Sequence, residues 1–108
     1  MKIGGNIKAT LQSKTGFQRN SIGERAPTWG DLHKFNAGWL DLSNGDSKYT
    51  YNAKLQESTH VFITDYVAID RKTNDKRLLV NGTVYEVLLI DDPMELHQQL
   101  EIYLKFVG

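Results

Sequence analysis

Three histidines are the side chains of this chain best suited to bind a metal ion, and they stand far apart at His33, His60 and His97. Two imidazoles reach one ion most easily when they lie four residues apart on a helix, and the sequence has no such pair. This scatter predicts no metal site, and we expect no bound cofactor.

Carboxylates could supply acid–base chemistry or bind calcium. Asp91 and Asp92 are adjacent, and Asp70 and Asp75 lie near a polar turn. The alternating acidic residues of a calcium loop, its glycine and its closing glutamate are missing from these stretches. We therefore expect these acidic residues at strand ends and turns.

Serine nucleophiles are the remaining catalytic possibility. A nucleophilic serine needs a sharp turn and a positioned base, and neither Ser21 nor Ser43 lies in a G-x-S-x-G setting. No combination of acid, base and nucleophile can be assembled from the sequence, so we expect a protein that is not an enzyme.

Composition limits the classes further. The 108 residues fit one domain, residues 1–108, and with no cysteine there can be no disulfide framework or thiolate site. The 13 basic residues balance the 13 acidic ones, which argues against duplex DNA as a direct target. No stretch has the apolar core of a signal peptide or the length of a membrane span, so we expect a soluble protein that makes no membrane contact.

The elements that must position any site begin with a hairpin. The stretch 77–93, "RLLVNGTVYEVLLIDDP", reads as two apolar strands joined by Asn81-Gly82, the pair that favours a type I′ turn. A two-residue turn sets Leu78 opposite Tyr85 and Arg77 opposite Glu86, with opposite charges facing each other.

Four other strands are predicted from residue patterns. Period-two alternation indicates strands near 7–11 and 100–106, and residues 38–42 are expected to form a short strand before a turn. The stretch 59–69 is apolar on both faces of a predicted strand. An unpaired charge would be costly there, so we expect Asp65 at a strand end, at a bulge or beside a cation. Residues 13–28 lack periodicity and read as a long surface excursion. Trp29 and Trp39 are expected to pack in the core or at its rim. The sum is an all-β, mainly antiparallel chain, a small five- to six-stranded β-barrel with long loops and little helix.

Small barrels also bind single-stranded nucleic acid by stacking bases on aromatic side chains in a basic groove. The residues that could form such a surface are Tyr49, Tyr51, Phe62 and Tyr66 with Lys48 and Lys54. The same residues can instead serve as barrel core, rim and solvated lysines, and that interpretation is favoured.

The order of features resembles the head-tail joining family of long-tailed phages, also called head-completion or stopper proteins. Its strand pattern "thrv.iry" followed by "ri.y.g..y.I..i.d" matches the outline of 59–66, "THVFITDY", and 77–91, and the resemblance covers roughly 28–107. Asp65 stands where the family often carries a basic residue. The resemblance implies a β-barrel that is monomeric in isolation and assembles as a ring below the portal and adaptor of the phage head.

The resemblance also implies a function and the residues that perform it. The ring would close the DNA channel after packaging, with packaged DNA in its lumen, and offer a docking surface for the tail completion protein; the alternative is a tail terminator or another neck ring protein. The protein would be made in the host bacterial cytoplasm and reside in the virion. The gate would be the loop 43–57, with the candidate residues Ser43, Asn44, Gly45, Asp46, Lys48, Tyr49, Tyr51 and Lys54. The framework would be the hairpin, with Arg77, Asn81, Gly82, Tyr85 and Glu86.

Overall fold

The computed structural model describes residues 5–42 and 58–107, and all structural statements below refer to these residues. They form antiparallel strands with almost no helix. The elements are β1 (Ala9–Arg19), β2 (Arg25–Phe35), β3 (Gly38–Leu42), β4 (His60–Asp65), β5 (Lys76–Val80), β6 (Thr83–Asp91), the 3-10 turn η2 (Pro93–Glu95) and β7 (Gln99–Phe106). The predicted all-β, mainly antiparallel class is confirmed.

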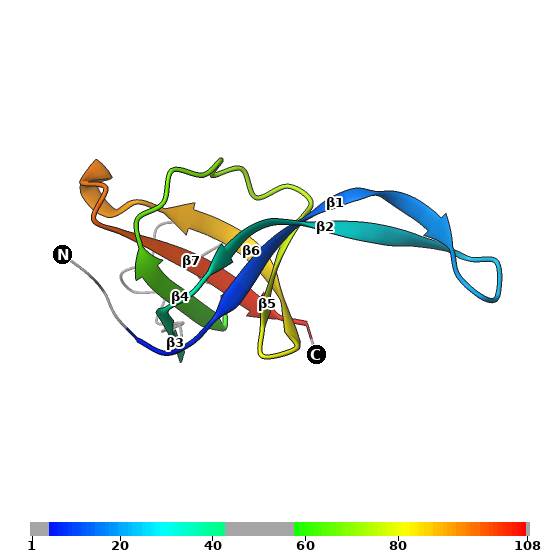
Figure 1. The fold of residues 1–108 in the computed structure, drawn as a ribbon, viewed down its shortest axis with the longest axis horizontal. Helices are drawn as coiled ribbons and strands as arrows, with labels where there is room; N and C mark the ends of the chain where they lie inside the picture. Colours follow the sequence, from blue (N-terminus) through cyan, green and yellow to red (C-terminus); the bar gives the residue numbers. More distant parts are fainter. Residues whose placement is uncertain (1–4, 43–57, 108) are drawn as a thin grey trace.

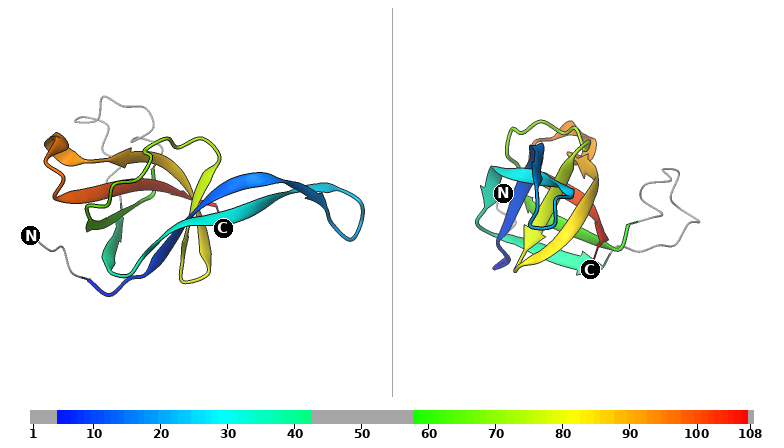
Figure 2. Two further views of the ribbon diagram at one scale, coloured as in Figure 1. Left: turned by 45° about the horizontal axis from the view of Figure 1, so that its top comes forward. Right: turned by 90° about the vertical axis from the view of Figure 1, so that its right-hand side faces the viewer.

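One sheet contains all seven strands, in the order β2-β1-β5-β6-β7-β4-β3. Its two edge strands, β2 and β3, follow each other in the chain with only Asn36 and Ala37 between them, so the sheet must curl until its edges approach (Figures 1 and 2). The backbone N–H of Ile7, just before β1, donates to the carbonyl of Gly38 at 3.1 Å. The result is a barrel-like, curled sheet that is not closed by a ladder between its edges in the described residues, with seven strands where five or six were expected.

The core fills the inside of this curl. Its fully buried side chains come from alternate positions of the strands, as expected for a sheet with one face turned inward. The largest are Leu11, Phe62, Leu78, Leu100, Ile102 and Leu104. Gly38 lets the edge strand β3 approach this core closely, because a Cβ at this position would lie 2.5 Å from the Phe62 ring.

The β5–β6 hairpin matches its prediction. Asn81 and Gly82 have φ of 51° and 81°, the positive values that a type I′ turn needs. The register pairs Leu78 with Tyr85 and Arg77 with Glu86, as expected. The Arg77 guanidinium, however, donates to Gln12 at 2.8 Å, so its closest polar partner is on β1 and not across the hairpin on Glu86.

The segment 13–28 is a second hairpin, which corrects its prediction as a surface excursion. β1 and β2 pair from Ala9↔Phe35 to Arg19↔Arg25, with register shifts between Leu11 and Gln12 and between Lys14 and Gly16. Only the first part of β1, Ala9 to Ser13, also pairs with β5. Lys14 N–H still donates to the carbonyl of Asp75 at 2.8 Å, and beyond it the two strands pair with each other alone. This part projects from the body of the fold (Figure 1), and we call residues 14–29 the arm.

The arm ends in a turn stabilised by one side chain. The Asn20 carboxamide oxygen accepts from the backbone N–H of Ile22 at 3.1 Å and from that of Glu24 at 2.9 Å. Gly23 takes φ of 83°, which suits glycine. The turn is thus specified locally, although the strands beside it have no buried face to produce an apolar alternation.

The other predicted strands are confirmed with changed limits. The first strand starts at Ala9 instead of residue 7, and the strand predicted over 59–69 ends at Asp65, which lies at a strand end as expected. β3 and β7 fall where they were predicted. Trp29 lies half-buried on β2, where its ring packs against the guanidinium of Arg77, and Trp39 on β3 is 52% exposed. Neither ring belongs to the buried core cluster.

Candidate functional site

The predicted gate residues Ser43 to Lys54 lie outside the described residues. The strands on either side of them are described: β3 and β4 pair as antiparallel neighbours, and Leu42 is opposite His60 at the end of their ladder. The segment 43–57 therefore follows Leu42 directly and rejoins the described chain at Ser58, two residues before His60.

The predicted framework residues Arg77, Asn81, Gly82, Tyr85 and Glu86 lie together on the β5–β6 hairpin. Tyr85 is buried, with its ring centroid 5.0 Å from that of His60 and 5.9 Å from that of Phe106. The hairpin is thus packed onto β4 and β7, which agrees with a supporting function.

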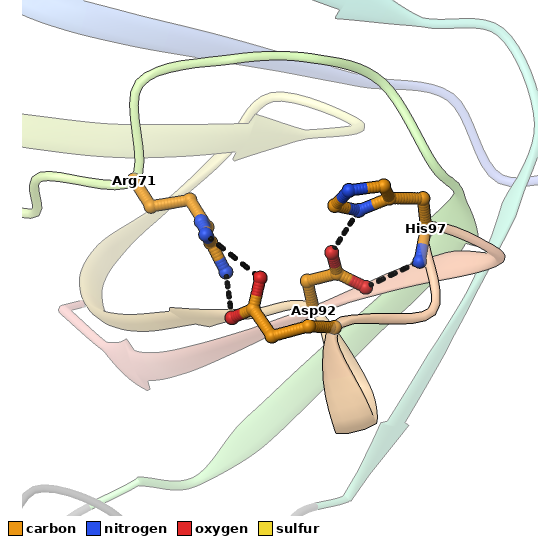
Figure 3. A network of polar contacts seen from close by, with 4 residues as sticks. Arg71, Asp92 and His97 are labelled. Atoms are coloured by element: carbon orange, nitrogen blue, oxygen red, sulfur yellow. Dashed lines mark hydrogen bonds and ion pairs between the residues drawn. The ribbon is translucent and has the colours of Figure 1, made fainter.

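A polar network that sequence reasoning missed closes the connection between β6 and β7 (Figure 3). Asp92 is 2% exposed, and its carboxylate accepts from the backbone N–H of His97 at 3.0 Å and lies 2.5 Å from His97 Nδ1. The His97 ring also lies against Tyr66, with centroids 4.5 Å apart. A buried carboxylate is tolerated when it is paired in this way.

Arg71 extends the network from the β4–β5 connection. Its guanidinium donates to both carboxylate oxygens of Glu95, at 2.9 and 3.3 Å, and the pKa of Arg71 is raised by this hydrogen bond and charge. The two loops at this end of the fold are thereby joined. In the sequence, the only indication of this network is that Asp92, Glu95 and His97 lie close together around Pro93. Their spacing matches none of the familiar metal-binding motifs.

Asp92, Glu95 and His97 could offer a metal ion one ligand atom each, because these atoms lie within 4.8 Å of one another. Each group already has a partner, however: Arg71 holds Glu95, and Asp92 holds His97. A cation would have to displace both, so the arrangement is best explained as a hydrogen-bonded turn. This interpretation agrees with the expectation that Asp91 and Asp92 mark a strand end.

Acidic side chains gather beside this turn, on the outward face of β6 and β7. Asp91 is directly opposite Glu101 in the ladder, which places like charges together. Burial and the charge of Glu101 raise the pKa of Asp91. Glu101 accepts from Gln99 at 2.7 Å and from the Tyr103 hydroxyl at 2.9 Å, and burial and this bond raise the pKa of Tyr103 to about 12.

Basic and aromatic side chains alternate along the arm at the other end of the molecule. The Arg25 guanidinium lies 4.7 Å from the Phe17 ring centroid, and Lys14 Nζ lies 5.7 Å from the centroids of both Phe17 and Trp29. Arg77 continues the row, with its guanidinium 4.2 Å from the Trp29 centroid. Cations held over ring faces in this way are attracted by the ring quadrupole, which orders the row.

Two open grooves accompany this row. One, of about 260 Å³, is lined by Phe17, Gln18, Arg19 and Arg25 on the arm. The other, of about 380 Å³, lies where the arm leaves the body and is lined by Pro27, Trp29, Lys76, Arg77, Val84, Glu86 and Val107.

Within the part of the chain that the structure describes, no helix has the length and hydropathy of a membrane span.

Comparison with solved structures shows that the fold is shared. The solution structure of protein SF1141 from Shigella flexneri 2a superimposes with a TM-score of 0.67 at 19% identity, over 98% of this chain and 96% of that chain. A chain of the virion of the native gene transfer agent particle gives a TM-score of 0.55 at 10% identity, over 92% of this chain and 91% of that chain. At such identities the likeness establishes the fold alone.

Comparison with curated proteins gives a short local match. It is to isoleucine–tRNA ligase from Pelagibacter ubique (strain HTCC1062), 37% identical over 49 residues. The matched segment is 45% of this chain and 5% of the ligase. A segment this small relative to the ligase carries no function from the enzyme to this chain.

Comparison with protein families decides the relationship. Residues 5–105, which include every strand described above except the last residue of β7, match the phage head completion protein family. The match confirms the resemblance that the strand pattern of 59–66 and 77–91 indicated. The chain belongs to the phage head completion protein family and is therefore a structural protein of the phage head.

Proposed function

We propose that this protein forms a ring below the portal and adaptor proteins, closes the DNA channel after packaging and provides the docking surface for the tail completion protein. The observation that carries the proposal is the family match over residues 5–105. In this function the chain is a single non-catalytic domain without a cofactor, made in the host bacterial cytoplasm and retained in the virion.

The direct pairing of β3 and β4 supports a gate formed by the segment that joins these two strands. The segment 43–57 joins two strands that pair directly, with Leu42 opposite His60. Antiparallel neighbours keep their register through the ladder itself, so a connection between them can change its path without moving the core. The candidate gate residues, from Ser43 to Lys54, all belong to this connection.

The charge balance of the chain also suits a channel through which DNA passes. Strong positive charge around the lumen would bind the phosphate backbone through counterion release and hold the DNA. With 13 basic and 13 acidic residues, the whole chain lacks such a field. Packaged DNA can then be retained by a closing loop and released when that loop moves.

The nucleic-acid-binding alternative loses part of its surface. Phe62, one of its stacking residues, is 0% exposed and belongs to the core. Tyr66 packs against His97 and against the core cluster. The remaining residues of that surface, Lys48, Tyr49, Tyr51 and Lys54, lie outside the described residues.

The test uses DNA-filled heads that carry portal and adaptor but lack this protein. Added wild-type protein should bind as a ring visible by electron microscopy, retain the DNA and permit tail attachment. The variant lacking 44–52 should bind equally well but let DNA leak, since only the gate is removed. Retention of DNA by heads with this variant would refute the gate assignment.

One further outcome separates this proposal from the tail-terminator alternative. Protein that does not bind heads but binds the end of completed tails would establish a tail terminator. A matched control is the substitution Asn74→Gly in the exposed β4–β5 connection, which should change neither ring formation nor DNA retention.

A further inference from the structure

The arm lacks the support that a two-stranded hairpin normally needs. Beyond the backbone hydrogen bond from Lys14 N–H to the carbonyl of Asp75, its strands pair only with each other, and a lone hairpin is marginally stable in water. It nevertheless exposes large apolar side chains, with Phe17 54% and Ile22 75% exposed. Apolar surface on a projecting element of this kind indicates a partner that covers it.

The chemistry of that partner follows from the charges around Phe17. Arg25 and Lys14 lie over its ring, and Arg19 lines the same groove. The acidic residues nearby are Glu24 in the turn and Asp75, whose carboxylate is 3.6 Å from Lys14 Nζ. The arm thus presents an apolar centre with a basic rim, and a complementary surface needs an apolar centre with an acidic rim.

The opposite end of the same molecule has this complementary composition. Met94 and Leu96 in the η2 connection are 86% and 59% exposed. Around them stand Glu95 and the facing carboxylates Asp91 and Glu101, and we call these five residues the acidic end. Arg71, which is paired with Glu95, adds one positive charge beside these three carboxylates. Figure 1 shows η2 and the tip of the arm at the two ends of the long axis, which measures 46 Å.

We propose that the arm of one copy docks on the acidic end of the next copy. Phe17 contacts Met94 and Leu96 of the neighbour, while Arg19 and Arg25 approach its Asp91 and Glu101. This contact names the surfaces that form the ring and so rests on the proposed function. Because the two surfaces differ, the contact is heterologous and propagates head to tail, and such contacts form a ring when the rotation between neighbours closes.

Two observations favour a second copy as the occupant over DNA. The arm carries Lys14, Arg19 and Arg25 against the single carboxylate of Glu24. The acidic end carries three carboxylates with only Arg71 beside them, so the two ends have opposite net charge and are complementary to each other. Asp91 and Glu101 face each other in the ladder, burial and then the charge of Glu101 raise the pKa of Asp91, and an arginine from a neighbour would relieve this repulsion. DNA would match the basic rim but would leave the acidic end and the apolar residues of both surfaces uncovered.

The absence of cysteine in the natural sequence allows a direct test by thiol crosslinking. The variant Gln18→Cys with Leu96→Cys places one exposed thiol in each surface. Its two thiols lie at opposite ends of the molecule, so they cannot react within one chain. A short bis-maleimide linker should therefore give a ladder of multimers, both in concentrated solution and on DNA-filled heads.

Matched variants make the result specific. Gln18→Cys with Asn36→Cys, which moves the second thiol to another exposed connection, should give at most a tenth of the multimers. We call Gln18→Cys with Leu96→Cys the reactive pair. Adding Arg25→Glu to it should reduce the yield of crosslinked multimers at least tenfold, and adding Glu101→Lys as well should restore that yield. Such rescue by charge exchange requires that the two ends meet, and it excludes misfolding as the cause of the loss.

Each outcome bears on a different claim. If the protein binds heads and retains DNA but the reactive pair gives no ladder there, the arm contact is wrong and the proposed function stands. If the ladder forms in solution but the protein ignores heads, the contact stands and the proposed function falls. Arm crosslinks to a head protein or protection of the arm by DNA, without multimers, would also overturn the contact.

Discussion

The fold contains two hairpins of opposite character, and the difference between them explains how the molecule is built. The β5–β6 hairpin has Leu78 and Tyr85 buried in the core and neighbouring strands on both sides. The β1–β2 hairpin has the same ladder of backbone hydrogen bonds, but its outer part, the arm, has no third strand and exposes Phe17. Backbone pairing alone defines the shape of a hairpin, while stability comes from the apolar face that it buries.

The largest expected effect tests this contrast with two phenylalanines. Phe62→Ala removes a fully buried ring and should lower the free energy of unfolding by about 3–5 kcal/mol. Phe17→Ala removes an exposed ring of the arm and should change it by less than about 0.5 kcal/mol. Urea unfolding of the two variants measures both values. Equal losses would show that the arm is part of the cooperative core.

The turns of the two hairpins give the next effect. Replacing Asn81-Gly82 by Val-Val forces two β-branched residues into positive φ and should cost about 2–4 kcal/mol, at roughly 1–2 kcal/mol for each residue. Gly23→Val also places a β-branched residue at positive φ, but a Cβ there would meet no atom within 4 Å. This variant should lower the melting temperature much less, since the tip of the arm can rearrange without unfolding the body. An unchanged thermal melt for the Val-Val variant would refute the framework function of the β5–β6 hairpin.

The smallest effect concerns pH. Burial and Glu101 raise the pKa of Asp91, so the folded chain binds this proton more tightly than the unfolded chain does. Ionisation of Asp91 therefore costs stability at neutral pH, and this cost vanishes when the pH falls below the ordinary carboxyl pKa of about 4.

Asp91→Asn should accordingly raise the melting temperature slightly at pH 7 and leave it unchanged at about pH 3. Glu24→Gln in the arm is the control, because this exposed residue lies far from the Asp91–Glu101 pair and should have no effect at either pH. A stabilisation of Asp91→Asn that persists at low pH would show that the gain does not come from the ionised carboxyl.

Strands with one buried face were predictable from the sequence, and the arm was not. Leu78, Tyr85 and Val87 alternate with more exposed neighbours because one side of β5 and β6 faces the core, and this period is visible in the residue types. Lys14 to Thr28 have no such face, so their sequence carries no period although they form strands. The segment could be identified as paired only when the ladder from Ala9↔Phe35 onward was seen.

The site was predictable only where local sequence defines it. Asn81-Gly82 specifies its turn through backbone preferences, and the prediction held in both conformation and register. The pairing of Asp92 with His97, and of Arg71 with Glu95, depends on how two connections meet at one end of the fold. No spacing rule joins Arg71 to Glu95, because their approach follows from the order of the strands.

By itself the sequence determined the all-β class, the β5–β6 hairpin and the family, because alternation, turn chemistry and strand order are properties of neighbouring residues. Only the tertiary structure decided which face of β4 is buried, since Phe62 and Ile63 are both apolar and the curl of the sheet selects Phe62. It also decided that the arm, with Lys14, Arg19 and Arg25, and η2, with Asp91 and Glu101 beside it, lie at opposite ends of the molecule (Figure 1). Such separation depends on contacts between distant residues, which a local pattern does not encode.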